Sequence, residues 1–177
     1  MLRLFVGIEL PAGLRLRLSL LCAGLPGARW VDPGNLHLTL RFIGEVDEGM
    51  ASDIDAALAR IRAPRFAVTL AGAGCFGGDK PRLLWIGVES SDALFQLHDR
   101  IEAALRRAGL APDTRRYSPH VTLARLKQVA VPLVQEFLSG HALFRADPVP
   151  VDRFSLIASY PTKAGAIYED QADYALT

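Results

Sequence analysis

The chain has 177 residues, half of them hydrophobic, which is enough to bury a continuous core. Its 20 basic and 19 acidic side chains nearly cancel, which excludes a protein that coats nucleic acid through a strongly basic face. The two cysteines, Cys22 and Cys75, have no CxxC spacing, which excludes a disulfide framework and a cysteine-rich zinc site. The first ten residues contain an acidic side chain and no long apolar core, so we expect no signal peptide, no membrane span and a cytoplasmic protein.

Hydrophobic periodicity in the first half predicts strands and helices in alternation. Residues 4–9 form a short apolar run that ends at a charge and Pro11, which is typical of a buried strand. Leucines 14, 18, 21 and 25 recur at helical spacing, so we expect a helix over residues 13–25. The pattern then predicts a strand over residues 36–42, a helix over 50–61 and a strand over 66–70.

The second half repeats this order. Residues 84–89 match residues 4–9 in the type of side chain at each position, about 80 residues later. A helix over residues 94–105, with Ser91 or Asp92 as its N-cap, a strand over 120–125, a helix over 131–138 and a strand over 154–158 follow. We interpret the chain as one domain built by internal duplication, with repeats of roughly 1–75 and 80–170, joined by a mobile glycine-rich connection over residues 72–81.

Each predicted repeat contains one His-x-Thr motif at the equivalent strand. On the first of these strands, His37, Thr39 and Arg41 alternate with Leu38, Leu40 and Phe42, so the polar side chains should share one face and the apolar ones the other. His120 and Thr122 repeat the arrangement. A single motif of this kind is usually a solvated strand face, but its recurrence at equivalent positions favours a function. We expect the two motifs to meet across a groove between the halves.

Two histidines in one groove suit the cleavage of a phosphodiester without a metal. One imidazole takes a proton from water, the other gives a proton to the departing oxygen, and hydroxyl and guanidinium groups hold the non-bridging oxygens. Because the ordinary pKa of histidine is near 6.5, one ring can be neutral while the other is protonated. His98 and His141 lack such a neighbourhood, and no HxH or HxxxH spacing is present, so we expect no metal and no cofactor.

Several segments together resemble the bacterial and archaeal RNA 2′,3′-cyclic phosphodiesterases, also called 2′-5′ RNA ligases, of the two-histidine phosphoesterase superfamily. The resemblance rests on residues 3–6, Trp30-Val31, residues 35–44, residues 74–76, residues 118–125 and Tyr168-Glu169. It spans nearly the whole chain. It implies an α+β fold of two lobes related by a pseudo-twofold axis, with largely antiparallel sheets around a central cleft and helices on the outside.

The resemblance also assigns roles within this cleft. It implies that the protein hydrolyses RNA 2′,3′-cyclic phosphate ends to 2′-phosphomonoesters, with His37 as proton donor and His120 as proton acceptor. Thr39 and Thr122 would bind the phosphate, and Arg125 matches a position that contacts substrate. Arg125 lies three residues after Thr122, so it reaches the cleft only if the strand ends or bulges near Ala124.

Two weaker candidates and several alternatives stay open. Arg41 has the correct strand parity for substrate binding, and Tyr117, just before Ser118-Pro119-His120, offers either a base-stacking surface or ordinary core packing. The partner would be an RNA end or a small cyclic nucleotide such as ADP-ribose 1″,2″-cyclic phosphate, because the motifs recognise phosphate. A protein that binds RNA ends without hydrolysing them, and formation of 2′-5′ linkages, are further hypotheses. We expect a monomer.

Overall fold

Ten strands form two four-stranded sheets and a small two-stranded one in the computed structural model, which describes residues 1–177. Sheet A has the order β10 (Gly165–Ala175), β9 (Arg153–Thr162), β1 (Leu2–Glu9) and β3 (His37–Val46). Sheet B has the order β2 (Ala28–Trp30), β7 (His120–Leu126), β6 (Leu83–Val88) and β5 (Leu70–Phe76), and β4 (Phe66–Val68) pairs with β8 (Val149–Val151). All pairs are antiparallel.

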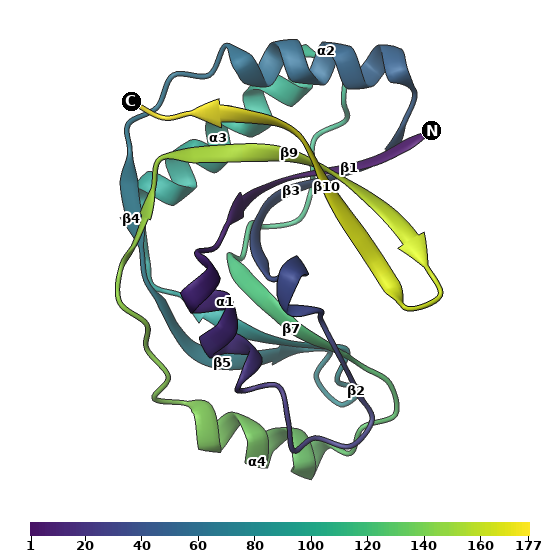
Figure 1. Ribbon diagram of the computed structural model, residues 1–177, viewed down its shortest axis with the longest axis vertical. Coiled ribbons are helices and arrows are strands. Elements are labelled where there is room, and N and C mark those ends of the chain that lie inside the picture. Colours follow the sequence, from purple (N-terminus) through teal and green to yellow (C-terminus); the bar gives the residue numbers. More distant parts are fainter.

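Four helices cover the outside of the two sheets (Figure 1). They are α1 (Ala12–Ser19), α2 (Glu48–Ala59), α3 (Asp92–Arg107) and α4 (Val131–His141), and a short 3-10 turn, η1 (Pro33–Asn35), precedes β3. Helices α2 and α3 pack together over sheet A, and α4 packs against sheet B. The predicted cap of α3 is confirmed, since the Ser91 side chain accepts a hydrogen bond from the Leu94 amide. None of these helices is long and apolar enough to cross a membrane.

The two halves of the chain exchange strands. The first half supplies β1 and β3 to sheet A but β2 and β5 to sheet B, whereas the second half supplies β6 and β7 to sheet B but β9 and β10 to sheet A. One hydrophobic cluster of 29 buried residues draws on both sheets. The α+β class with antiparallel sheets and outer helices, expected from the sequence, is confirmed.

Two expectations about the repeat require correction. Residues 72–76 are not a mobile connection, because β5 (Leu70–Phe76) pairs with β6 as the edge of sheet B. The two similar runs at 4–9 and 84–89 are also out of register with the motifs, since Glu9 pairs with His37 whereas Gly87 pairs with His120. The displacement of two residues preserves which face each side chain occupies, and this is why the hydrophobic pattern conceals it.

Candidate active site

The two His-x-Thr motifs lie on neighbouring strands of different sheets. Strands β3 and β7 approach within 8 Å between Cα atoms, although they share no hydrogen-bonded ladder. The Nδ1 atom of His37 lies 2.5 Å from the carbonyl oxygen of Asn35, and that of His120 lies 2.7 Å from the carbonyl oxygen of Ser118. A carbonyl can only accept, so each Nδ1 carries a proton and each Nε2 is left for chemistry.

His37 lies in an aromatic pocket on sheet A. The Phe5 ring stacks on the imidazole at a centroid distance of 4.7 Å, and the Tyr168 ring meets it edge-on at 5.1 Å. Gly7 makes room for the ring, since a Cβ there would lie 3.2 Å from the His37 Cδ2 atom. Burial lowers the pKa of His37 from 6.5 to about 4, against the opposing effect of the hydrogen bond to Asn35. The ligand-free protein therefore holds a neutral His37 at pH 7.

His120 lies among different aromatic side chains on sheet B. The Phe76 ring meets the imidazole edge-on at 5.0 Å, and the Trp85 ring centroid lies 6.0 Å away. Trp85 lies across the backbone of Gly74, where a Cβ would come within 2.2 Å of the indole. Gly74 and Phe76 belong to β5, so this strand builds the wall beside His120.

The two threonines occupy equivalent, half-buried positions two residues after the histidines. The Thr39 hydroxyl lies 3.2 Å from His37 Nε2, so it donates to the neutral ring. Thr122 pairs across the ladder with Trp85. Because residues two apart on a strand share a face, each hydroxyl accompanies its imidazole on the cleft side.

A β-bulge follows each motif and changes the face of the residues beyond it. The ladder skips Leu40 in β3 and Leu123 in β7. Two consecutive residues after each threonine are therefore buried, Leu40 and Arg41 in one strand and Leu123 and Ala124 in the other. The residue three positions after each threonine returns to the cleft side: Phe42 in β3 and Arg125 in β7. The condition that the sequence set for Arg125 is thus met.

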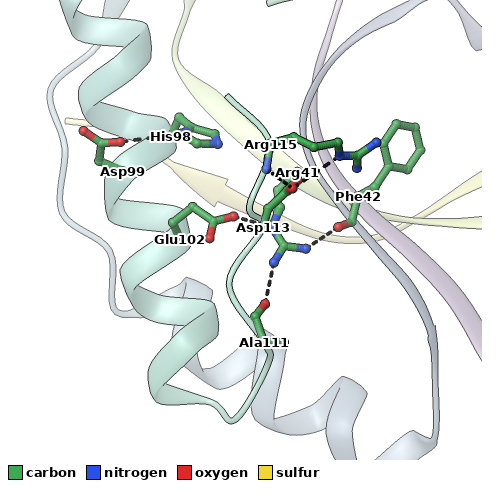
Figure 2. Close-up of polar contacts among 8 residues, drawn as sticks. All are labelled: Arg41, Phe42, His98, Asp99, Glu102, Ala111, Asp113 and Arg115. Atoms are coloured by element: carbon green, nitrogen blue, oxygen red, sulfur yellow. Dashed lines mark hydrogen bonds and ion pairs between the residues drawn. The ribbon is translucent and has the colours of Figure 1, made fainter. Parts of the chain in front are cut away.

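Arg41 does not lie in the cleft, so the parity argument that placed it beside His37 is wrong. Its side chain is buried and pairs with Glu102 of α3, and its other guanidinium nitrogens donate to the carbonyl oxygens of Phe42 and Ala111, the latter at 2.8 Å. Figure 2 shows the guanidinium directed toward α3 and the Ala111 segment, with the Phe42 ring pointing away from it. The bulge turned Arg41 toward the helix layer.

Tyr117 supports the motif from behind. Its hydroxyl donates to the Thr39 carbonyl oxygen at 3.0 Å, and His98 stacks on its ring at 4.0 Å with an interplanar angle of 1°. Burial raises the pKa of this hydroxyl. Since its hydroxyl is engaged and one ring face is covered by His98, Tyr117 positions β3 against α3 and does not offer the stacking surface that we considered from the sequence.

Arg125 belongs to β7, on the sheet that holds His120, and its side chain is exposed. Burial raises the pKa of the Tyr168 hydroxyl, and the positive charges of Arg125 and Arg3 oppose that rise. Both histidines, both threonines and Arg125 from the predicted set thus lie on β3 and β7, two strands that approach within 8 Å between Cα atoms.

Phe42 and Tyr168 are site residues that the sequence reasoning missed. Phe42 was expected on the core side, yet its side chain is 57% exposed and contacts Phe5 at a centroid distance of 5.8 Å. It also borders a surface pocket of about 360 Å³ beside Arg41, Ile43 and residues 110–115, which includes neither motif. No alternation rule could have placed Phe42, because the bulge has no signal in the sequence. Three or more His, Cys, Asp or Glu side chains do not gather anywhere at metal-binding distance.

The arrangement defines a class: two imidazoles whose Nδ1 atoms donate to backbone carbonyls, each followed two residues later by a threonine, on two neighbouring strands of an α+β fold. Comparison with known proteins agrees. The family model described as the 2′-5′ RNA ligase superfamily matches residues 16–161. Among curated proteins, the RNA 2′,3′-cyclic phosphodiesterase of Aeropyrum pernix is 38% identical over 88% of this chain and 89% of that protein. That of Escherichia coli is 35% identical over 73% of this chain and 74% of the relative.

Solved structures give the same result. The crystal structure of E. coli LigT in apo form superposes with a TM-score of 0.82 and 31% identity, covering 99% of this chain and 98% of LigT. The crystal structure of LigT complexed with 3′-AMP gives a TM-score of 0.82 and 29% identity over the same shares of the two chains. This chain belongs to the 2′-5′ RNA ligase superfamily.

Proposed function

We propose that the protein hydrolyses 2′,3′-cyclic phosphate ends of RNA to 2′-phosphomonoesters, as a cytoplasmic monomer. The observation that carries the proposal is the pair of imidazoles on neighbouring strands whose Nδ1 atoms are held by backbone carbonyls, which leaves the two Nε2 atoms to act as acid and base. Relatives named RNA 2′,3′-cyclic phosphodiesterases support the choice of substrate. Both half-sites come from a single chain, so no second copy is needed.

The proposed reaction uses the histidines in sequence. His120 Nε2 takes a proton from water, and the water oxygen forms a bond to phosphorus. The bond from phosphorus to the ribose 3′ oxygen breaks, and His37 Nε2 gives that oxygen a proton. Thr39, Thr122 and Arg125 hold the non-bridging oxygens as negative charge builds on them. When a 5′-terminal hydroxyl replaces water as the nucleophile, the same steps form a 2′-5′ linkage: His120 takes the proton of that hydroxyl, its oxygen bonds to phosphorus, and the 3′ oxygen leaves with a proton from His37.

The neutral state of His37 constrains this scheme. A proton donor must carry a proton, yet the pKa of free His37 is about 4 because the ring is buried. We propose that the phosphate anion, on entering this poorly solvated pocket beside His37, raises the pKa of the ring, which then takes up a proton from the solvent. Arrival of the substrate then charges the acid.

Phe42 supplies the proposed surface for the base. Its ring is exposed and contacts Phe5, the ring that stacks on His37, and stacking of a base on an aromatic ring contributes about 1–3 kcal/mol. Stacking tolerates any base, so we expect weak preference among the four nucleotides.

The test is direct. Purified protein in EDTA should convert nucleoside 2′,3′-cyclic phosphates to the 2′ isomer, and His37→Ala and His120→Ala should each remove turnover while the circular dichroism spectrum stays unchanged. Thr69→Ala is a matched control, because Thr69 lies between β4 and β5, away from both motifs. Binding of the cyclic nucleotide without turnover by the wild type would identify an RNA-end binding protein instead.

A further inference from the structure

Two arginine side chains, Arg29 and Arg125, project from the same face of sheet B. Arg29 of β2 pairs directly with Arg125 of β7, and both side chains are exposed. Directly opposed residues of an antiparallel ladder project from the same face. Their neighbours confirm which face it is, because the next pairs, Trp30 with Ala124 and Ala28 with Leu126, pack on the opposite side against the cluster beneath α4.

This pair has no acidic partner. Five ion pairs are present in the protein, and none of them includes Arg29 or Arg125. Like charges placed opposite one another on a sheet are destabilising. Two guanidinium groups about 5 Å apart at the backbone can, however, share one phosphate through paired hydrogen bonds. The uncompensated pair therefore has the chemistry of an anion site.

The pair lies beyond the reacting phosphate. Arg125 is three residues after Thr122, about 10 Å along the strand at the usual rise, and Arg29 belongs to the outer edge strand of the sheet. Arg125 can turn back toward Thr122 or outward toward Arg29. Arg29 lies one strand further from His120 and Thr122 than Arg125 does.

We propose that Arg29 binds the phosphodiester that precedes the cyclic end, with Arg125 between this group and the reacting phosphate, so that the site selects RNA chains over mononucleotides. This inference rests on the proposed hydrolysis of cyclic ends and adds its substrate class. A mononucleotide has no such group, so Arg29 has nothing to bind in that case. Arg29 thus determines specificity without acting on the reacting atoms.

The experiment compares two substrates across three variants. We would measure kcat/KM for a nucleoside 2′,3′-cyclic phosphate and for a trinucleotide that ends in the same group. Arg29→Ala should lower kcat/KM for the trinucleotide about tenfold and leave the mononucleotide unchanged. Arg29→Lys should restore part of the loss. Arg60→Ala removes one charge from the end of α2, in the helix layer of sheet A, and should change neither substrate.

Salt dependence gives an independent readout. The slope of log kcat/KM for the trinucleotide against log salt should become shallower by about 0.7 in Arg29→Ala, the value for one phosphate contact on a single strand. Equal losses on both substrates, or no loss on the trinucleotide, would overturn the inference. So would a wild type with equal kcat/KM on both, although cyclic-end hydrolysis would stand.

A binding measurement tests the role of Arg29 even if the protein proves not to hydrolyse cyclic phosphates. If the wild type turns over neither substrate, the proposed function fails. The affinity of Arg29→Ala for a trinucleotide ending in a 2′-phosphate, measured by fluorescence anisotropy, still tests the anion site. A tenfold weaker affinity supports the site, and an unchanged affinity sinks it.

Discussion

The two motif strands, β3 and β7, share one backbone pattern but differ in the chemistry of the residue that follows the bulge. In each, a strand carries His-x-Thr, a bulge follows, and the third residue after the threonine returns to the cleft. That residue is the aromatic Phe42 on sheet A and the cationic Arg125 on sheet B. The histidines differ as well, since Phe5 and Tyr168 enclose His37 whereas Phe76 and Trp85 lie beside His120. A repeated scaffold can therefore hold a polarised substrate, with the base at one end and the charge at the other.

The largest expected effect separates the roles of the histidines. Each His→Ala change should lower kcat for a cyclic nucleotide on the order of 10⁴-fold. A nitrophenyl phosphodiester loses a phenolate that needs no proton, so the variant that lacks the acid should recover most of its activity on it. We expect recovery in His37→Ala and none in His120→Ala. The opposite pattern would exchange the two roles.

Arg41 should matter for stability and not for catalysis. Arg41→Met leaves the partly buried Glu102 without its partner, a change that costs up to about 3 kcal/mol in free energy of unfolding. Urea denaturation measures the loss. The kcat of the folded fraction should stay near the wild-type value, and a selective rise in KM would return Arg41 to the substrate site. Arg41→Met combined with Glu102→Leu should regain stability.

The buried His37 should make stability depend on pH. Its pKa is about 4 in the folded protein and near 6.5 in the unfolded chain, so the unfolded state binds an extra proton between these values. Above pH 6.5 the ring is neutral in both states and does not make stability depend on pH. As the pH drops below 6.5, the free energy of unfolding falls, by about 3 kcal/mol at pH 4. Urea midpoints of the wild type and His37→Gln should therefore converge or cross on acidification. Parallel curves would contradict the burial of the ring.

The smallest expected effect compares the residues that close the two half-sites. Phe42→Ala should raise KM about tenfold for cyclic nucleotides through lost stacking, with no change in salt dependence. Arg125→Ala should raise KM by a similar factor that disappears at high salt. Steady-state kinetics at two ionic strengths distinguish them. Identical salt behaviour of the two variants would mean that the ends of the cleft are not chemically different.

The sequence predicted the four helices, although α1 ends at Ser19 and not at residue 25, and it predicted the strands that carry the two motifs, because these elements depend on local periodicity. Helix caps, strand alternation and each His-x-Thr motif can be recognised from a few neighbouring residues, as with Ser91 at the start of α3. Arg125 came from resemblance, and its position needed a bulge that no local pattern announces.

The remaining errors arose from long-range pairing. Arg41 and Phe42 exchange faces only because β3 bulges against β1, and the glycine-rich segment becomes β5 only because it finds β6. Tyr168 reaches His37 across two intervening strands, β9 and β1. Such contacts join residues far apart in the chain, and alternation within one segment cannot reveal them.

The exchange of strands between the sheets sets the order in which the protein can be completed during synthesis. β1 pairs on one side with β3 and on the other with β9, so Leu4 cannot pair with Ala158 until that residue has been synthesised. A ribosome adds about 5–20 residues per second, so the second edge of β1 stays open for roughly 8–30 seconds. Tyr168 emerges later still, and only then is the pocket around His37 closed to water. A truncated chain lacking β10 would thus carry both motifs and yet lack the environment that tunes the first histidine.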